Sequence, residues 1–146
     1  MRNFFILLFS IFIIFSCSKK EPEALSTPSN QDEAIKVYRE GLKDLEDGQF
    51  FLAWKKFDQS ESLLPQTQWA AKSALMSSFC LYSMNFYDDA ILNLRRFTKT
   101  YPADANIDYA NYLIAISYYE QILDEDKDIE PLILSKNEIE KFIDKY

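Results

Sequence analysis

From Asp32 onward, the apolar residues recur at steps of three and four, which is the spacing of an amphipathic helix and not the alternation of a strand. Ile35 begins the first apolar stripe, which continues to Leu45 before Gly48 breaks the pattern. Five further stripes of the same kind follow along the chain. The pattern therefore predicts six helices and no strand.

Several boundary residues support these helices. Thr67 and Asn106 are predicted to cap the third and fifth helices, because a short polar side chain can accept a bond from a free N–H group of the first turn. The fifth helix is expected to extend to about Leu123. Residues 124–130 are strongly charged and are predicted to form a loop, and Pro131 suits the first turn of the last helix.

The N-terminus of the chain is typical of a processing segment. Residues 4–15 form an apolar run that is too short to span a bilayer as a helix, which needs about 20 residues. The run Ile14-Phe15-Ser16-Cys17 resembles a bacterial lipobox, which implies cleavage before the cysteine and attachment of a diacylglycerol to its sulfur. We therefore expect residues 1–16 to be a lipoprotein signal peptide and Cys17 to be lipidated. An ordinary secretory signal or an uncleaved anchor is the alternative.

The segment after the signal peptide is polar and contains two prolines. Residues 17–31 are therefore predicted to hold the lipidated cysteine and a flexible spacer, ahead of a folded domain at residues 32–146. Ser18 stands directly after the cysteine, where an Asp would signal retention. This residue implies sorting to the outer membrane.

The predicted helices are related in pairs by a repeat of 37 residues. In the first helix, Tyr38, Gly41 and Leu45 carry a large, small, large pattern that recurs twice at this offset, and in the second helix Ala53 corresponds to Ala90. Small residues such as Gly41 and Ala53, when they face each other, let two helices approach closely. The sequence thus predicts three helical hairpins, at about residues 33–66, 67–103 and 105–146.

The repeat resembles the tetratricopeptide repeat (TPR). A TPR has a small residue in its first helix, an Ala and an aromatic residue in its second helix and a closing Pro, which Gly41, Ala53, Phe57 and Pro65 match. Ser60 departs from the pattern, which usually has Ala there. The expected fold class is all-α, a TPR-like superhelix of three helical hairpins after a signal peptide and spacer. An unrelated helical bundle is the alternative.

Composition narrows the classes of function. The chain of 146 residues has 23 acidic and 16 basic residues and a net charge of −7, and such a chain repels the phosphates of nucleic acids. It contains no His, which removes the usual general base and the commonest zinc ligand. We therefore expect no nucleic-acid partner, no catalytic residue, no metal and no cofactor, although an enzyme that uses paired carboxylates is an alternative. Cys80 is expected to be a buried, inert thiol.

Further motifs resemble one family in particular. The repeats begin with the motif Y-x-x-G-x-x-x-L-x-x-G-x-F-x-x-A at residues 38–53, and the stretch from Asn106 to Gln121 has features that TPR packing does not require. With the lipobox and the spacer, these motifs resemble the BamD family, the TPR lipoproteins of the β-barrel assembly machinery, over about residues 33–146. Members of that family are longer, so the resemblance implies an N-terminal portion.

The resemblance implies a non-enzymatic scaffold, lipid-anchored at the periplasmic face of the outer membrane. Its expected partners are the core barrel subunit and other subunits of the machinery, and unfolded outer-membrane proteins. Another TPR lipoprotein, such as a pilotin for pilus secretin assembly, is the alternative.

Stacked hairpins form a concave groove that suits extended peptides. The candidates for groove or inter-repeat positions, with core packing as the alternative for each, are Tyr38, Leu42, Leu45, Tyr82, Tyr112 and Tyr119. Three basic residues of the fourth helix either meet a peptide carboxylate or form a solvated face, namely Arg95, Arg96 and Lys99.

Overall fold

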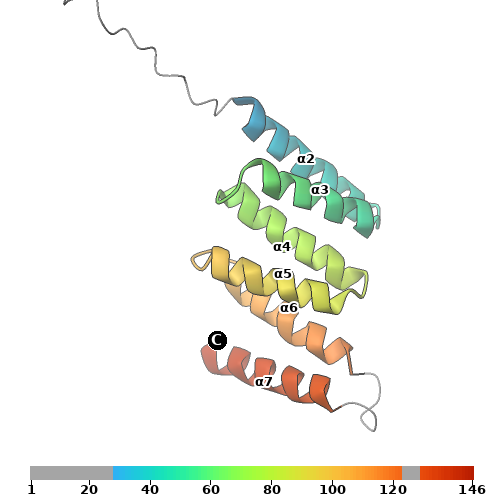
Figure 1. Ribbon diagram of the computed structural model, residues 1–146, viewed down its shortest axis with the longest axis vertical. Coiled ribbons are helices and arrows are strands. Elements are labelled where there is room, and N and C mark those ends of the chain that lie inside the picture. Colours follow the sequence, from blue (N-terminus) through green and yellow to red (C-terminus); the bar gives the residue numbers. More distant parts are fainter. Residues whose placement is uncertain (1–27, 123–128) are drawn as a thin grey trace, which may run out of the picture.

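The computed structural model describes residues 28–122 and 129–146, and these ranges contain six helices and no strand (Figure 1). The helices follow one another in a single stack, and each packs mainly on the helix before it and the helix after it. They are α2 (Pro28–Glu46), α3 (Phe50–Leu63), α4 (Gln68–Ser83), α5 (Tyr87–Thr100), α6 (Ile107–Glu120) and α7 (Glu130–Lys145). The predicted all-α class and the arrangement in helical hairpins are confirmed.

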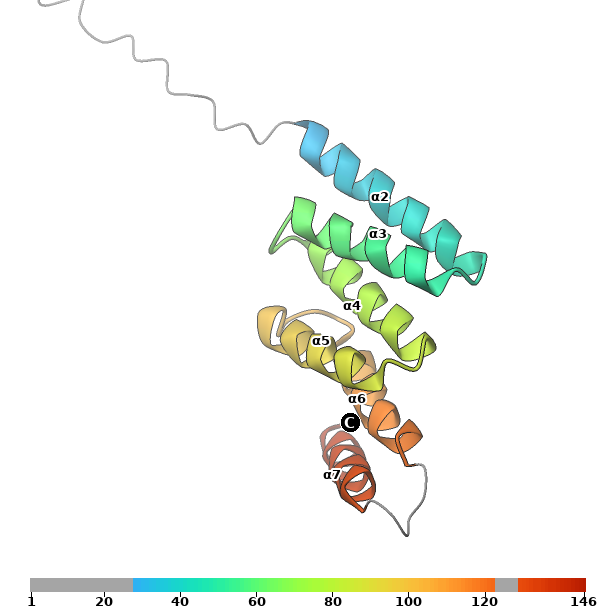
Figure 2. The same ribbon diagram turned by 45° about the vertical axis from the view of Figure 1, so that its right-hand side comes forward.

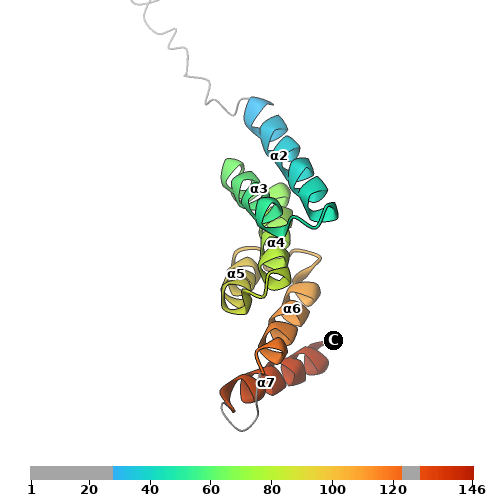
Figure 3. The same cartoon turned by 90° about the vertical axis from the view of Figure 1, so that its right-hand side faces the viewer.

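The stack has two sides, which the rotated views separate (Figures 2 and 3). In Figure 3, α3 and α5 lie on one side, whereas α2 and α6 lie on the other. The first helices of successive hairpins also touch directly, since α2 contacts α4 and α4 contacts α6. Each first helix therefore packs against both helices of the preceding hairpin, as in a TPR solenoid.

The helix ends agree with the sequence in some places and differ in others. Thr67 caps α4 as predicted, because its Oγ1 accepts a hydrogen bond of 3.2 Å from the N–H of Ala70. Helix α2 begins at Pro28, four residues before the expected start of the domain. The predicted lipidation site Cys17 and most of the predicted charged loop lie outside the described residues.

The two ends of α6 correct the prediction. Asn106 occupies the N-cap position, but its side chain does not cap the helix and instead donates a hydrogen bond of 2.9 Å to Asp104 Oδ1. The helix ends at Glu120 rather than near Leu123. The reason is that the N–H groups of Gln121 and Ile122 bond to carbonyls only three residues back, which tightens the last turn and ends the helix.

The first hairpin is held by an aromatic ring packed against a glycine. A Cβ placed on Gly41 would lie 3.0 Å from the ring of Phe57 and 3.1 Å from Cβ of Lys56. The expected partner, Ala53, is fully buried, but its side chain is not the closest one to Gly41. Gly41 is therefore the small residue that the close approach of α2 and α3 requires. The side chain that it accommodates is the ring of Phe57, which lies one turn after Ala53 on α3.

Ser60 links three helices, which accounts for its departure from the TPR pattern. Its Oγ donates a hydrogen bond of 3.0 Å to the carbonyl of Ala34 on α2 and accepts one of 2.9 Å from Ser73 Oγ on α4. Both serines are fully buried, so each hydroxyl needs such a partner. An alanine at position 60 would leave the hydroxyl of Ser73 without this acceptor.

Cys80 is a free cysteine inside the stack, as predicted. The side chain is fully buried against Ala53 and Phe57. Burial disfavours the thiolate and raises the pKa of Cys80 to about 12. The thiol therefore stays protonated at physiological pH and behaves as a small apolar side chain.

Replacing Ala90 with leucine should destabilise the second hairpin. Ala90 is fully buried at the start of α5, so added methyl groups must displace their neighbours at a cost of about 1–3 kcal/mol. Urea unfolding followed by circular dichroism measures the change. Lys99→Leu on the same helix is the control, because Lys99 is exposed and its replacement should change the free energy of unfolding by less than about 0.5 kcal/mol. Equal effects of the two variants would show that position 90 has room for leucine.

Candidate protein-binding surface

The six candidate groove positions occupy three registers of the repeat on the first helices. Tyr38 and Tyr112 lie at one register, Leu45, Tyr82 and Tyr119 lie at another, and Leu42 lies at the third. In the first two hairpins, residues at these registers pack against the hairpin that follows. The structure therefore groups these residues by repeat register, but it gives them different surroundings.

In the first hairpin, the candidates are inter-repeat packing residues. The ring of Tyr38 lies 5.4 Å from the ring of Trp69 on α4 in an edge-on arrangement. Leu42 and Leu45 pack against the cluster that contains Cys80 of α4. All three side chains are partly buried, and burial raises the pKa of Tyr38. Helix α4 therefore covers them.

Tyr82 on α4 has a similar place at the second boundary. Its side chain is partly buried against the second core cluster, which includes Ala110 and Leu113 of α6. The ring also lies 5.8 Å from the ring of Tyr87 on α5. Burial is the main cause that raises the pKa of Tyr82. This residue also contributes to packing between repeats.

The two candidates on α6 are different, because about half of each residue is exposed to solvent. Tyr112 is 47% exposed and Tyr119 is 56% exposed. The ring of Tyr112 lies 6.3 Å from Phe142 of α7 and 6.3 Å from Tyr109, with which it stacks. Tyr109, which the sequence analysis missed, belongs to the same apolar stripe. Spacing of three along α6 was the signal that could have identified it.

An apolar groove runs between α6 and α7, and we call it the α6/α7 groove. It consists of two adjoining cavities of about 280 and 390 Å³ that share Ile139. Leu132 and Ile139 on α7 are both exposed along it. The remaining lining residues are Tyr112, Ala115, Ile116, Phe142, Tyr119, Ile122, Ser135, Lys136 and Glu140.

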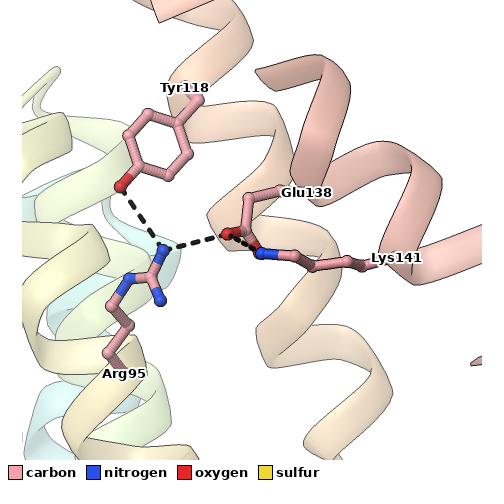
Figure 4. A network of polar contacts seen from close by, with 4 residues as sticks. All are labelled: Arg95, Tyr118, Glu138 and Lys141. Atoms are coloured by element: carbon pink, nitrogen blue, oxygen red, sulfur yellow. Dashed lines mark hydrogen bonds and ion pairs between the residues drawn. The ribbon is translucent and has the colours of Figure 1, made fainter. Parts of the chain in front are cut away.

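Arg95 joins the last three helices rather than remaining available for a peptide carboxylate (Figure 4). Its Nη2 lies 3.0 Å from Glu138 Oε1 on α7 and 3.5 Å from the hydroxyl of Tyr118 on α6. Lys141 approaches the same carboxylate oxygen at 3.1 Å. The four side chains form one network that connects α5, α6 and α7.

The neighbouring Arg96 points toward α3. Its guanidinium forms a two-bonded pair with Glu61 on α3, in which Nη2 lies 2.9 Å from Oε2. Successive residues of α5 thus join that helix to α3 and to α7. Arg95, Arg96 and Lys99 are all exposed, as the solvated-face interpretation requires, and the two arginines also pair with carboxylates of other helices.

Residues 28–122 and 129–146 contain neither a metal-binding cluster nor a membrane-spanning helix. No group of three or more His, Cys, Asp or Glu residues in these ranges has the arrangement of a metal site. Within the same part of the chain, no helix has both the length and the apolar character that crossing a bilayer demands.

Comparison with known families identifies the chain. A sequence model of the YfiO family, described as "Outer membrane lipoprotein", matches residues 30–146, which include nearly all of the helical stack. The chain belongs to the YfiO family of outer membrane lipoproteins. The protein is therefore located at the outer membrane. The resemblance inferred from the motifs is confirmed.

Curated relatives of this YfiO-family chain include proteins from three organisms. Each of them is named "Outer membrane protein assembly factor BamD". The protein of Caulobacter vibrioides is 36% identical over 92 residues, which are 63% of this chain and 30% of that protein, and the protein of Rickettsia prowazekii is 30% identical over 129 residues, which are 88% of this chain and 49% of that protein. The protein of Neisseria gonorrhoeae is 28% identical over 92 residues, which are 62% of this chain and 34% of that protein. The chain therefore spans half the length, or less, of these relatives.

Proposed function

We propose that this protein is a non-catalytic scaffold of the machinery that assembles β-barrel proteins and inserts them into the outer membrane. The observation that carries the proposal is the YfiO-family match over residues 30–146, together with relatives named as assembly factors. A stack of hairpins suits this role, because it offers an extended surface to several partners at once.

We further propose that Cys17 carries the lipid anchor at the periplasmic face. The lipobox-like run ends at this cysteine, and α2 begins only eleven residues later, at Pro28. Each buried CH₂ of an acyl chain contributes about 0.8 kcal/mol to membrane binding, and two or more chains make a stable anchor. Such an anchor would hold the stack close to the membrane in which the β-barrels are inserted.

The proposed partners are the barrel-forming core subunit, other subunits of the machinery and unfolded outer-membrane proteins. Exposed aromatic side chains favour contacts with such partners, because they bury a large apolar area at a small cost in side-chain entropy. Tyr112 and Tyr119 are the proposed contact residues, since they are the most exposed of the six candidates.

Crosslinked pull-down of the full chain from its own cell envelope, followed by mass spectrometry, tests this proposal. The barrel-forming core subunit should be enriched over a control in which residues 1–31 carry an unrelated soluble domain. This control keeps the proposed anchor and removes the helical stack. Enrichment of a pilus secretin instead would support the pilotin function, and recovery of neither class would contradict the scaffold proposal.

A further inference from the structure

An apolar pocket lies between α3 and α5, on the side of the stack opposite to α2 and α6 (Figure 3). Its volume is about 330 Å³, and we call it the α3/α5 pocket. Helices α3 and α5 both pack on α4, so the pocket is internal to the stack. The lining residues are Phe51 and Trp54 of α3, Leu81 of α4, Met84 and Phe86 of the turn that follows, and Asp89 and Asn93 of α5.

Two aromatic residues of the pocket are half exposed, and the repeat does not require either of them. Phe51 is 50% exposed and Phe86 is 52% exposed. At an offset of 37 residues, Asp88 takes the place of Phe51, and Gln49 takes the place of Phe86. A polar side chain is therefore compatible with the hairpin at both places. Exposed apolar residues that gather around a cavity are typical of a binding site.

The aromatic wall of the pocket is fixed within α3. The ring of Phe51 lies 5.6 Å from the ring of Trp54, and Nζ of Lys55 lies 4.8 Å from the centre of the Phe51 ring. Trp54 in turn packs against the core cluster that contains Phe57. The wall is therefore formed before any partner arrives, which lowers the entropic cost of binding.

The charge at the edge of the pocket is negative. Asp89 lines the pocket, and Asp88 precedes it in the first turn of α5. In the part of the chain that the structure describes, neither carboxylate has a basic side chain as its ion-pair partner. Lys55 is not among the lining residues. The pocket can therefore accept a basic group beside an apolar one, whereas anionic lipid headgroups would be repelled.

We propose that the α3/α5 pocket binds a segment of a partner protein in which a large apolar side chain stands next to a Lys or Arg. The apolar side chain occupies the cavity, whose volume is at the lower end of the range for ligand pockets, about 300–1,000 Å³. The basic group pairs with Asp89. This site does not depend on the proposed scaffold function, and it lies apart from the groove candidates on α2, α4 and α6.

Selection from a random-peptide phage library tests the proposal. The library is first depleted on empty lipid nanodiscs and on nanodiscs that hold the full chain with Phe51→Ala and Asp89→Lys. It is then selected on the unaltered full chain in nanodiscs. The enriched peptides should carry Lys or Arg within two residues of an aromatic or large aliphatic residue. A selection that enriches no peptide, or peptides without a basic residue, would overturn the proposal.

Single variants locate the site with a fluorescein-labelled copy of the most enriched peptide. Phe51→Ala and Asp89→Asn should each weaken binding, measured by fluorescence anisotropy, by about tenfold. The matched controls are Leu52→Ala and Asp88→Asn, because each is the exposed neighbour of a pocket residue and lines no part of the pocket. Both controls should stay within about twofold of the unaltered protein. Equal losses in the pocket variants and the controls would overturn the assignment.

An exchange of charges separates a direct ion pair from a general effect on folding. Asp89→Lys should reject the labelled peptide, because two cations would then meet at the edge of the pocket. A peptide in which Glu replaces the basic residue should bind this variant at least about fivefold more tightly than it binds the unaltered protein. A variant that binds neither peptide would overturn the role given to Asp89.

Two measurements without substitutions in the pocket decide between the possible occupants. A photoreactive benzophenone at the apolar position of the peptide should crosslink to Met84 or Phe51, and crosslinks to α2 or α6 would overturn the proposal. Brominated lipids in the nanodiscs should leave the fluorescence of Trp54 unchanged in a Trp69→Phe variant, which has no other tryptophan. Quenching of Trp54 would assign the pocket to the membrane surface and overturn the proposal.

Discussion

Replacing Phe57 with alanine is expected to lower the free energy of unfolding by about 3–5 kcal/mol. The ring is fully buried in the first hairpin, where it packs on Gly41 and lies 5.3 Å from the ring of Tyr38. Alanine would remove these contacts and leave a cavity that the surrounding helices can close only in part. Chemical denaturation followed by circular dichroism measures the loss.

Phe51→Ala is the matched control for this variant. Phe51 lies six residues earlier on the same helix, but it is 50% exposed. The same chemical change should therefore cost less than about 1 kcal/mol, because much of the ring is already in contact with water. Similar losses for the two variants would contradict the packing described for the first hairpin.

Replacing Cys17 with alanine is expected to abolish acylation and membrane attachment. The sulfur of Cys17 is the proposed acceptor of the diacylglycerol, and alanine offers no nucleophile in its place. In a Gram-negative host, the unaltered chain should incorporate radiolabelled palmitate and fractionate with the membranes. The Cys17→Ala variant should carry no label and should appear as uncleaved precursor or as released protein.

The second cysteine supplies the control for that experiment. Cys80 is fully buried, and its thiol stays protonated because burial raises its pKa to about 12. A Cys80→Ala variant should therefore keep the full palmitate label. Label that persists in Cys17→Ala and disappears in Cys80→Ala would reverse the assignment of the acylated residue.

The sequence alone determined the helices, because helix formation leaves a local signal. Steps of three and four predicted six helices, and the cap at Thr67 is a contact between residues only three apart. The repeat of 37 residues also predicted the hairpins, because equivalent positions carry side chains of equivalent size. The YfiO-family assignment followed from motifs in the same residues.

Only the tertiary structure decided which side chains are exposed. Tyr38 and Tyr112 share a register and an identity, but Trp69 of the next hairpin covers the first, whereas the second borders an open groove. Periodicity reports the helix face on which a residue lies, and it does not report what packs on that face from elsewhere in the chain.

The same reason explains the remaining differences. Arg95 and Arg96 are adjacent in sequence, yet their carboxylate partners are 43 and 35 residues away and lie on opposite sides of α5. The close approach at Gly41 depends on how α3 is rotated, which brings Phe57 rather than Ala53 against the glycine. Local pattern thus determined the helices and their pairing, whereas long-range packing decided which contacts, ion pairs and exposed surfaces those helices form.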